Sequence, residues 1–143
     1  MISKANSDPM IDALSKKDDN DLQNLYIKKV EFSTKNNQLA SIKYIYSDGK
    51  QSATFGTKVA STFKVYEFID DNIYSVGLFA LENSVQQITF YDKRQKVLVK
   101  CGNIGDDNKL IKIPEGHKIV YAYGANSSDG KMVGMLGFTM WNC

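Results

Sequence analysis

The residues that could do chemistry are few and are spread along the chain. His117 is the only histidine, which excludes a metal site built on paired histidines and makes a nucleophile–histidine–acid arrangement hard to build. Asp-Asp-Asn runs occur at 18–20, 70–72 and 106–108, but each supplies too few oxygens for the roughly six to eight ligands of calcium. We therefore expect no catalytic residues, no metal and no cofactor, and we do not expect an enzyme.

Length and composition describe a chain that can bury a core of its own. Its 143 residues are 43% hydrophobic and 24% charged, which is typical of one soluble globular domain and excludes a wholly disordered chain. The formal net charge of +2 is too small to indicate a nucleic-acid partner. No run of about 20 apolar residues is present, so no membrane span is expected.

The cysteines and the first residues bear on the cellular compartment. No apolar run among residues 1–20 resembles a secretory signal. Without an export signal, Cys101 and Cys143 are expected to be free thiols. The sequence therefore predicts an intracellular protein of the cytoplasm or another reducing compartment.

Residues 1–24 differ from the rest and are expected to form a helical or flexible tail before one domain at 25–143. Pro9 follows Ser7-Asp8 and is typical of a first helical position. Apolar residues at helical spacing follow it, which predicts a short helix near 9–16 ended by a polar link. The apolar side of that helix is a candidate docking arm for another protein.

From Leu25 onward the sequence is typical of β-strands. β-branched and aromatic residues fill short stretches such as 42–46 and 63–68, and turn residues such as Ser47-Asp48-Gly49 separate them. These stretches lie too close together for crossover helices between parallel strands. The sheets are therefore expected to be antiparallel.

The strands repeat with a period of 46 residues. Similar strands begin at Ile27, Ile73 and Ile119, each 46 residues after the last (27 to 73 to 119). Phe55-Gly56 and Cys101-Gly102 keep the same offset. The second strand of each unit starts 15 residues after the first in units one and two (27 to 42, 73 to 88) and 17 in unit three (119 to 136). The third unit is therefore predicted to have a loop two residues longer.

A unit of this size holds about four short strands, the content of one Greek key, and such a unit cannot bury its apolar face alone. Three such sheets around a common axis would form a three-sided prism with pseudo-threefold symmetry. The alternating apolar residues are expected inside it: Ile27, Val30, Ile42, Tyr44, Tyr46, Ile73, Val76, Ile88, Phe90, Val97, Val99, Ile111, Ile113, Ile119, Tyr121, Leu136, Phe138 and Met140.

Together these features resemble the jacalin-related lectins over residues 26–143. The stretches that carry the resemblance are 27–30, 42–49, 55–56, 111–120 and 130–138. The resemblance implies an all-β fold, a β-prism of three four-stranded antiparallel Greek-key sheets, with the first key completed by both chain ends.

The resemblance also implies a sugar site at a loop of pattern G-x-x-x-D, whose carboxylate accepts hydrogen bonds from two sugar hydroxyls. Here Gly134 stands where the Asp belongs, and residues 1–24 lack the glycines that the family brings to the same pocket. Asp129 either replaces the lost acceptor or belongs to a Ser-Asp-Gly turn. The candidate sugar loop consists of Asp129, Gly130, Lys131, Met132, Val133 and Gly134.

The loops of the first two units are secondary candidates, and they are equally ordinary as solvated turns. Their polar residues are Asn36, Asn37, Glu82 and Asn83. Two functions therefore stay open. The first is a non-catalytic binding module of lectin fold, with a degenerate sugar site, that joins other proteins. The second is a carbohydrate-binding lectin that uses Asp129 or these loops. The sequence leaves open whether the chain forms a homo-oligomer.

Overall fold

The structure, a computed structural model, describes residues 24–69, 72–81, 84–127, 130 and 133–142. These residues form ten β-strands and one short 3-10 helix, with no α-helix among them. The predicted all-β class is therefore confirmed. The helix predicted near 9–16 lies outside the described residues.

The first sheet is built around one long hairpin. Its elements are β1 (Ile27–Lys35), β2 (Gln38–Tyr46), β3 (Phe55–Gly56), the 3-10 helix η1 (Ala60–Thr62) and β4 (Lys64–Glu67). The strands are antiparallel in the order β3-β2-β1-β4. The last strand of this sheet in the sequence, β4, therefore lies beside the first, β1.

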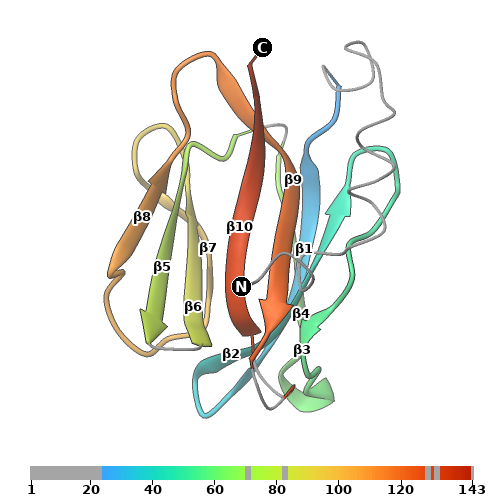
Figure 1. Ribbon diagram of the computed structural model, residues 1–143, viewed down its shortest axis with the longest axis vertical. Helices are drawn as coiled ribbons and strands as arrows, with labels where there is room; N and C mark the ends of the chain where they lie inside the picture. Colours follow the sequence, from blue (N-terminus) through green and yellow to red (C-terminus); the bar gives the residue numbers. More distant parts are fainter. Residues whose placement is uncertain (1–23, 70–71, 82–83, 128–129, 131–132, 143) are drawn as a thin grey trace.

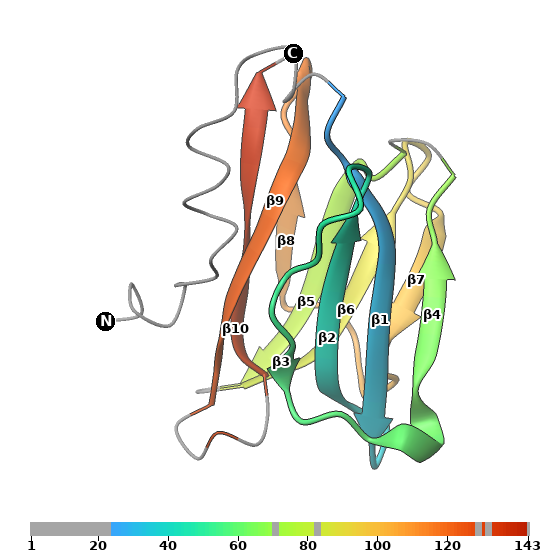
Figure 2. The ribbon, with the colours of Figure 1, turned by 90° about the vertical axis from the view of Figure 1, so that its right-hand side faces the viewer.

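The second sheet has the same strand order, and the third is described by two strands. The second sheet contains β5 (Ser75–Leu81), β6 (Ser84–Tyr91), β7 (Val97–Cys101) and β8 (Lys109–Lys112), in the order β7-β6-β5-β8. The third contains β9 (His117–Asn126) and β10 (Val133–Asn142). Figure 1 shows the β9–β10 pair between the two larger sheets, and Figure 2 shows the strands of all three running roughly along one axis.

Strand register confirms the repeat. The residue pairs at the same place in the three hairpins are Val30–Tyr44, Val76–Phe90 and Ala122–Phe138. From one hairpin to the next, the paired residue of the first strand lies 46 residues later (30 to 76 to 122). The paired residue of the second strand lies 46 and then 48 residues later (44 to 90 to 138). The two extra residues are the longer third loop that the sequence predicts. A register shift follows at the same place in each hairpin, after Ser33, Phe79 and Ala125.

The three sheets pack on one another through repeat-related side chains. Tyr44, Phe90 and Phe138, one from each hairpin, form two edge-to-face pairs, with ring centroids 6.1 Å apart for Tyr44–Phe138 and 6.3 Å for Phe90–Phe138. Such pairs add stabilisation beyond the burial of their area. Because the three rings come from three sheets, the core lies where the inner faces of the sheets meet.

Most of the predicted core is confirmed. Its buried members are Ile27, Val30, Ile42, Tyr44, Tyr46, Ile73, Val76, Ile88, Phe90, Ile119, Tyr121 and Leu136. Five further predicted residues are only partly buried: Val99, Ile111, Ile113, Phe138 and Met140.

The prediction for Val97 is wrong, because this side chain is 54% exposed. Simple alternation places Val97 and Val99 on the same face of β7. The pairing of β7 with β6 shifts register between these two residues, since Val99 lies opposite Phe90 and Val97 opposite Tyr91. A bulge of this kind reverses which face the next residue occupies, so Val97 points outward.

Candidate functional site

The candidate sugar loop lies between β9 and β10, and the structure describes only part of it. Asp129, Lys131 and Met132 lie outside the described residues. Gly130 is exposed, has a φ of 75°, and donates its backbone N–H to Ser127 O at 2.8 Å. Because Asp129 itself is not described, its two alternatives, sugar acceptor or turn residue, stay open.

Val133 and Gly134 belong to strand β10 rather than to the loop. Val133 is buried and pairs with Asn126. At Gly134, a Cβ atom would lie 2.5 Å from Asn126 O and 2.9 Å from Ser127 N. The glycine is therefore required by the close approach of two backbones, and a side chain at 134 would have to push β9 away.

Gly134→Ala is expected to destabilise the fold by about 1–3 kcal/mol, the usual cost of overpacking. The clash is with backbone atoms, which cannot rotate away as a side chain can. Gly105→Ala is the matched control, because its Cβ would meet nothing closer than 3.8 Å. Urea unfolding followed by circular dichroism measures both. A Gly134→Ala midpoint equal to that of Gly105→Ala would contradict the close approach.

Two of the secondary loop candidates, Asn36 and Asn37, lie at the tip of the first hairpin. Asn36 and Asn37 have φ values of 53° and 66° and join the paired residues Lys35 and Gln38. Two successive residues with positive φ form the tight turn that fits the twist of a hairpin. Asn37 O also accepts a hydrogen bond from Asn103 N at 2.7 Å. These asparagines therefore have a structural reason to be present.

Glu82 and Asn83 lie outside the described residues, between the paired residues Leu81 and Ser84. Figure 1 shows that β1, β5 and β9 all end at the same, lower end of the molecule. Near this end lies a small cavity of about 160 Å³, between the β1–β2 tip and the end of β7. At the end of β9, the Asn126 side chain is already engaged, because its Oδ1 accepts a hydrogen bond from Gly56 N–H at 2.7 Å.

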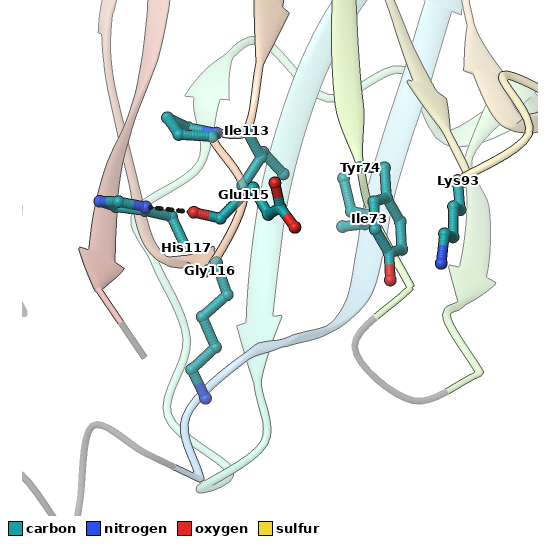
Figure 3. Close-up of a pocket in the computed structure, with 9 residues that line it drawn as sticks. Ile73, Tyr74, Lys93, Ile113, Glu115, Gly116 and His117 are labelled. Carbon is teal, nitrogen blue, oxygen red and sulfur yellow. Dashed lines mark hydrogen bonds between the residues drawn. The ribbon is translucent and has the colours of Figure 1, made fainter.

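A larger pocket lies at the other end of the molecule, and the sequence analysis missed it. Its volume is about 470 Å³, within the usual range for small-molecule sites. Its lining residues are Ile73, Tyr74, Lys93, Ile113, Pro114, Glu115, Gly116, His117 and Lys118. Figure 3 shows Glu115 and His117 on one side of the pocket, with Tyr74 and Lys93 on the facing side. We call it the Tyr74 pocket.

The Tyr74 pocket is formed by three segments far apart in the sequence. Tyr74 precedes β5, Lys93 lies in the β6–β7 turn, and Glu115 lies in the β8–β9 turn. In the sequence, the only indication of this pocket is Pro-Glu-Gly at 114–116, because Pro and Gly are typical of a turn. Such a turn would leave the side chain of its middle residue, Glu115, at the surface. His117 is partly buried, and its Nδ1 lies 3.1 Å from Glu115 O.

Outside the pocket, Tyr91 and Asp107 form a side-chain pair. Burial, and then the hydrogen bond and charge of Asp107, raise the pKa of Tyr91 to about 12. Gly77 makes room for the carboxylate, since a Cβ there would meet the Asp107 side chain. The pair ties the segment after β7 to the outer face of the second sheet, and we interpret it as structural.

The described residues show no cluster suited to a metal. No group of three or more His, Cys, Asp or Glu side chains among them is arranged to hold a metal ion. Cys101 is a buried free cysteine, as predicted, whereas Cys143 lies outside the described part. In that same part of the chain, no helix is long and apolar enough to cross a membrane.

Comparison with protein families and with curated proteins gives no match, whereas solved structures of similar fold are found. Calystegia sepium agglutinin is 18% identical, covers 82% of this chain and 84% of its own, and has a TM-score of 0.63. Artocarpin in complex with mannotriose is 22% identical over 81% and 83% of the two chains, with a TM-score of 0.59. A mannose-binding lectin from Champedak is 20% identical over 81% and 82%, with a TM-score of 0.61. The chain therefore has the jacalin-like lectin fold that its sequence predicts.

Proposed function

We propose that the chain is a non-catalytic binding module in which residues 25–143 form a β-prism of three Greek keys. The order of strands in the two four-stranded sheets, with the fourth strand beside the first, is that of a Greek key. The β9–β10 hairpin corresponds to the central hairpin of each of those sheets. A binding role fits neighbours of this fold that are lectins, although fold alone does not determine function.

The β9–β10 loop of this module is proposed to be degenerate as a sugar site. The observation that carries this is the position of Gly134, whose missing Cβ faces the Asn126 carbonyl oxygen at 2.5 Å. A carboxylate cannot be placed there without moving a backbone, so the acceptor that the lectin resemblance implies has no place at 134. The alternative is a lectin that uses Asp129 or the neighbouring loops.

A glycan array with the wild type and Asp129→Ala tests the two readings. If the loop is degenerate, both proteins give the same pattern of glycans, with equal affinities in calorimetric titration. Loss of a wild-type signal in Asp129→Ala, with an unchanged thermal melt, would instead establish the loop as a sugar site. Asp48→Ala is a matched control, because Asp48 lies in another Ser-Asp-Gly turn.

The partner of the module is proposed to be a protein that binds through residues 1–24. The apolar residues at helical spacing in this tail would supply a face for a partner groove. A chain without residues 1–20 is expected to keep a cooperative melt and to lose the proteins that the full chain retains in affinity capture. If the truncated chain fails to fold, the tail completes the β-prism and is not a docking arm.

A further inference from the structure

We propose that the Tyr74 pocket binds a neutral pyranose ring, at the end of the molecule opposite the β9–β10 loop. This inference goes beyond the proposed function, which concerns the loop and the tail. The pocket and the loop lie at the two ends of β9, since His117 begins that strand and Asn126 ends it. Ten residues of extended strand separate the two ends by about 30 Å, so the two sites are independent.

The backbone that carries the pocket is held in place by its own hydrogen bonds. Tyr74 is fixed between two strands, because its N–H donates to Tyr91 O at 2.8 Å and its carbonyl accepts Ile113 N–H at 3.2 Å. In the β6–β7 turn that holds Lys93, Asp92 Oδ1 accepts the N–H groups of Arg94 and Lys96, each at 2.9 Å.

The Glu115 turn is closed in a similar way. His117 N–H donates to Pro114 O at 3.0 Å, and Gly116 has a φ of 77°. Positive φ at this place is typical of a type II turn, which favours glycine there. All three segments are therefore ordered before a ligand arrives, and such preorganisation lowers the entropy cost of binding.

The side chains match the two kinds of surface that a pyranose presents. The Tyr74 side chain is 46% exposed and offers a ring against which the C–H face of a sugar can pack, with a hydroxyl at its edge. Across the pocket, the Glu115 carboxylate is suited to accept hydrogen bonds from two adjacent sugar hydroxyls. In the described part of the chain, no hydrogen bond or ion pair engages the Glu115 carboxylate.

The charge of the pocket favours a neutral, polyhydroxylated ligand over a simple ion. Glu115 and Lys93 carry opposite charges on facing sides of the pocket, so a simple ion of either sign would meet one like charge. Lys118, which also lines the pocket, is only 8% exposed and has an interaction of its own. Each sugar hydroxyl both donates and accepts, so a sugar can use the carboxylate and an ammonium together. Ile73, Ile113 and Pro114 add apolar lining, against which the less polar parts of the ring can pack.

The test is a glycan array of neutral and acidic glycans, followed by calorimetric titration of each hit with pocket and loop variants. We expect a neutral glycan to bind the wild type, and we expect Tyr74→Ala and Glu115→Gln each to weaken it at least tenfold. Tyr74→Phe keeps the ring and should retain most of the affinity. Asp129→Ala, at the other end of β9, should bind like the wild type.

The outcomes separate this inference from the proposed function. Affinity that falls in Asp129→Ala but not in Tyr74→Ala would overturn both. No glycan binding by the wild type, or binding that none of these variants changes, would overturn the pocket while leaving the degenerate loop in place. Tyr74 is half exposed, so Tyr74→Ala should melt like the wild type. If it does not, Glu115→Gln decides the matter alone.

Discussion

Replacing Phe90 with alanine is expected to lower the free energy of unfolding by about 3–5 kcal/mol. The ring is fully buried and packs edge-to-face on Phe68 and Phe138, with centroids 5.3 and 6.3 Å away. Phe68 follows β4 in the first sheet, and Phe138 belongs to the third. A cavity at Phe90 therefore opens where all three sheets meet, and a close-packed interior fills such a cavity only in part. Urea unfolding followed by circular dichroism gives the value.

Val97→Ala is the control for Phe90→Ala, because it shortens an exposed side chain of the same sheet. It should change the free energy of unfolding by less than about 0.5 kcal/mol. Ile88→Ala and Leu136→Ala, at equivalent places in their hairpins, should each cost about 2–5 kcal/mol. Near-neutral effects at Phe90, Ile88 and Leu136 alike would mean that the strand register is wrong.

The repeat explains why the fold could be predicted from the sequence. Each unit places an apolar residue at the same step, as in the buried set Ile42, Ile88 and Leu136. Local patterning, turn residues and the repeat all indicate the same hairpin, and such agreement across levels is what specifies a fold. The longer loop of the third unit can be predicted from the sequence, because its two extra residues shift the second strand of that unit by the same number of positions.

Val97 and Gly134 show where the sequence pattern was insufficient. A register shift in β7 exposes Val97, and its cause lies in the pairing with another strand rather than in the alternation of residues. The family motif predicts that Gly134 is a loop residue, yet Gly134 lies in β10 against Asn126. In both cases a neighbouring strand decides the outcome, and no local pattern encodes that neighbour.

The Tyr74 pocket was missed for a related reason. Its principal side chains, Tyr74, Lys93 and Glu115, come from three connections that share no motif and are adjacent only after the sheets form. By contrast, the sequence indicates the candidate sugar loop between β9 and β10, because a family pattern covers its consecutive residues. Sites assembled from the ends of several strands become visible only in the folded chain.

Raising the pH above 9 is expected to reduce the stability of the fold steeply. Burial raises the pKa of the Cys101 thiol well above its ordinary value of 9.0. Burial, followed by the neighbouring Cys101 and Tyr46, raises the pKa of Tyr44 above its ordinary value of 10.0. Both groups stay protonated in the folded state after they ionise in the unfolded state, so the unfolded state gains stability as the pH rises.

The sign and size of this effect follow from linkage. The contribution of each group is fully present below its unfolded pKa and is lost as the pH rises toward its folded pKa. Each group lowers the free energy of unfolding by about 1.4 kcal/mol per pH unit in that window. Between pH 9 and 11, Cys101 therefore accounts for about 2 kcal/mol and Tyr44, from pH 10, for about 1 kcal/mol. Urea unfolding in a reducing buffer, at half-unit steps of pH, measures the slope.

Two variants separate titration from packing. Cys101→Ala removes the thiol and should lower the slope between pH 9 and 10, even though its stability at pH 7 also falls. Ile88→Ala removes the residue opposite Cys101 in the β6–β7 pair without removing a titrating group, so it should lower stability at every pH and keep the wild-type slope. If Cys101→Ala and Ile88→Ala show the same slope, the thiol ionises as readily in the folded state as in the unfolded one. Solvent would then reach the Cys101 thiol, and the end of β7 would not be packed against the core.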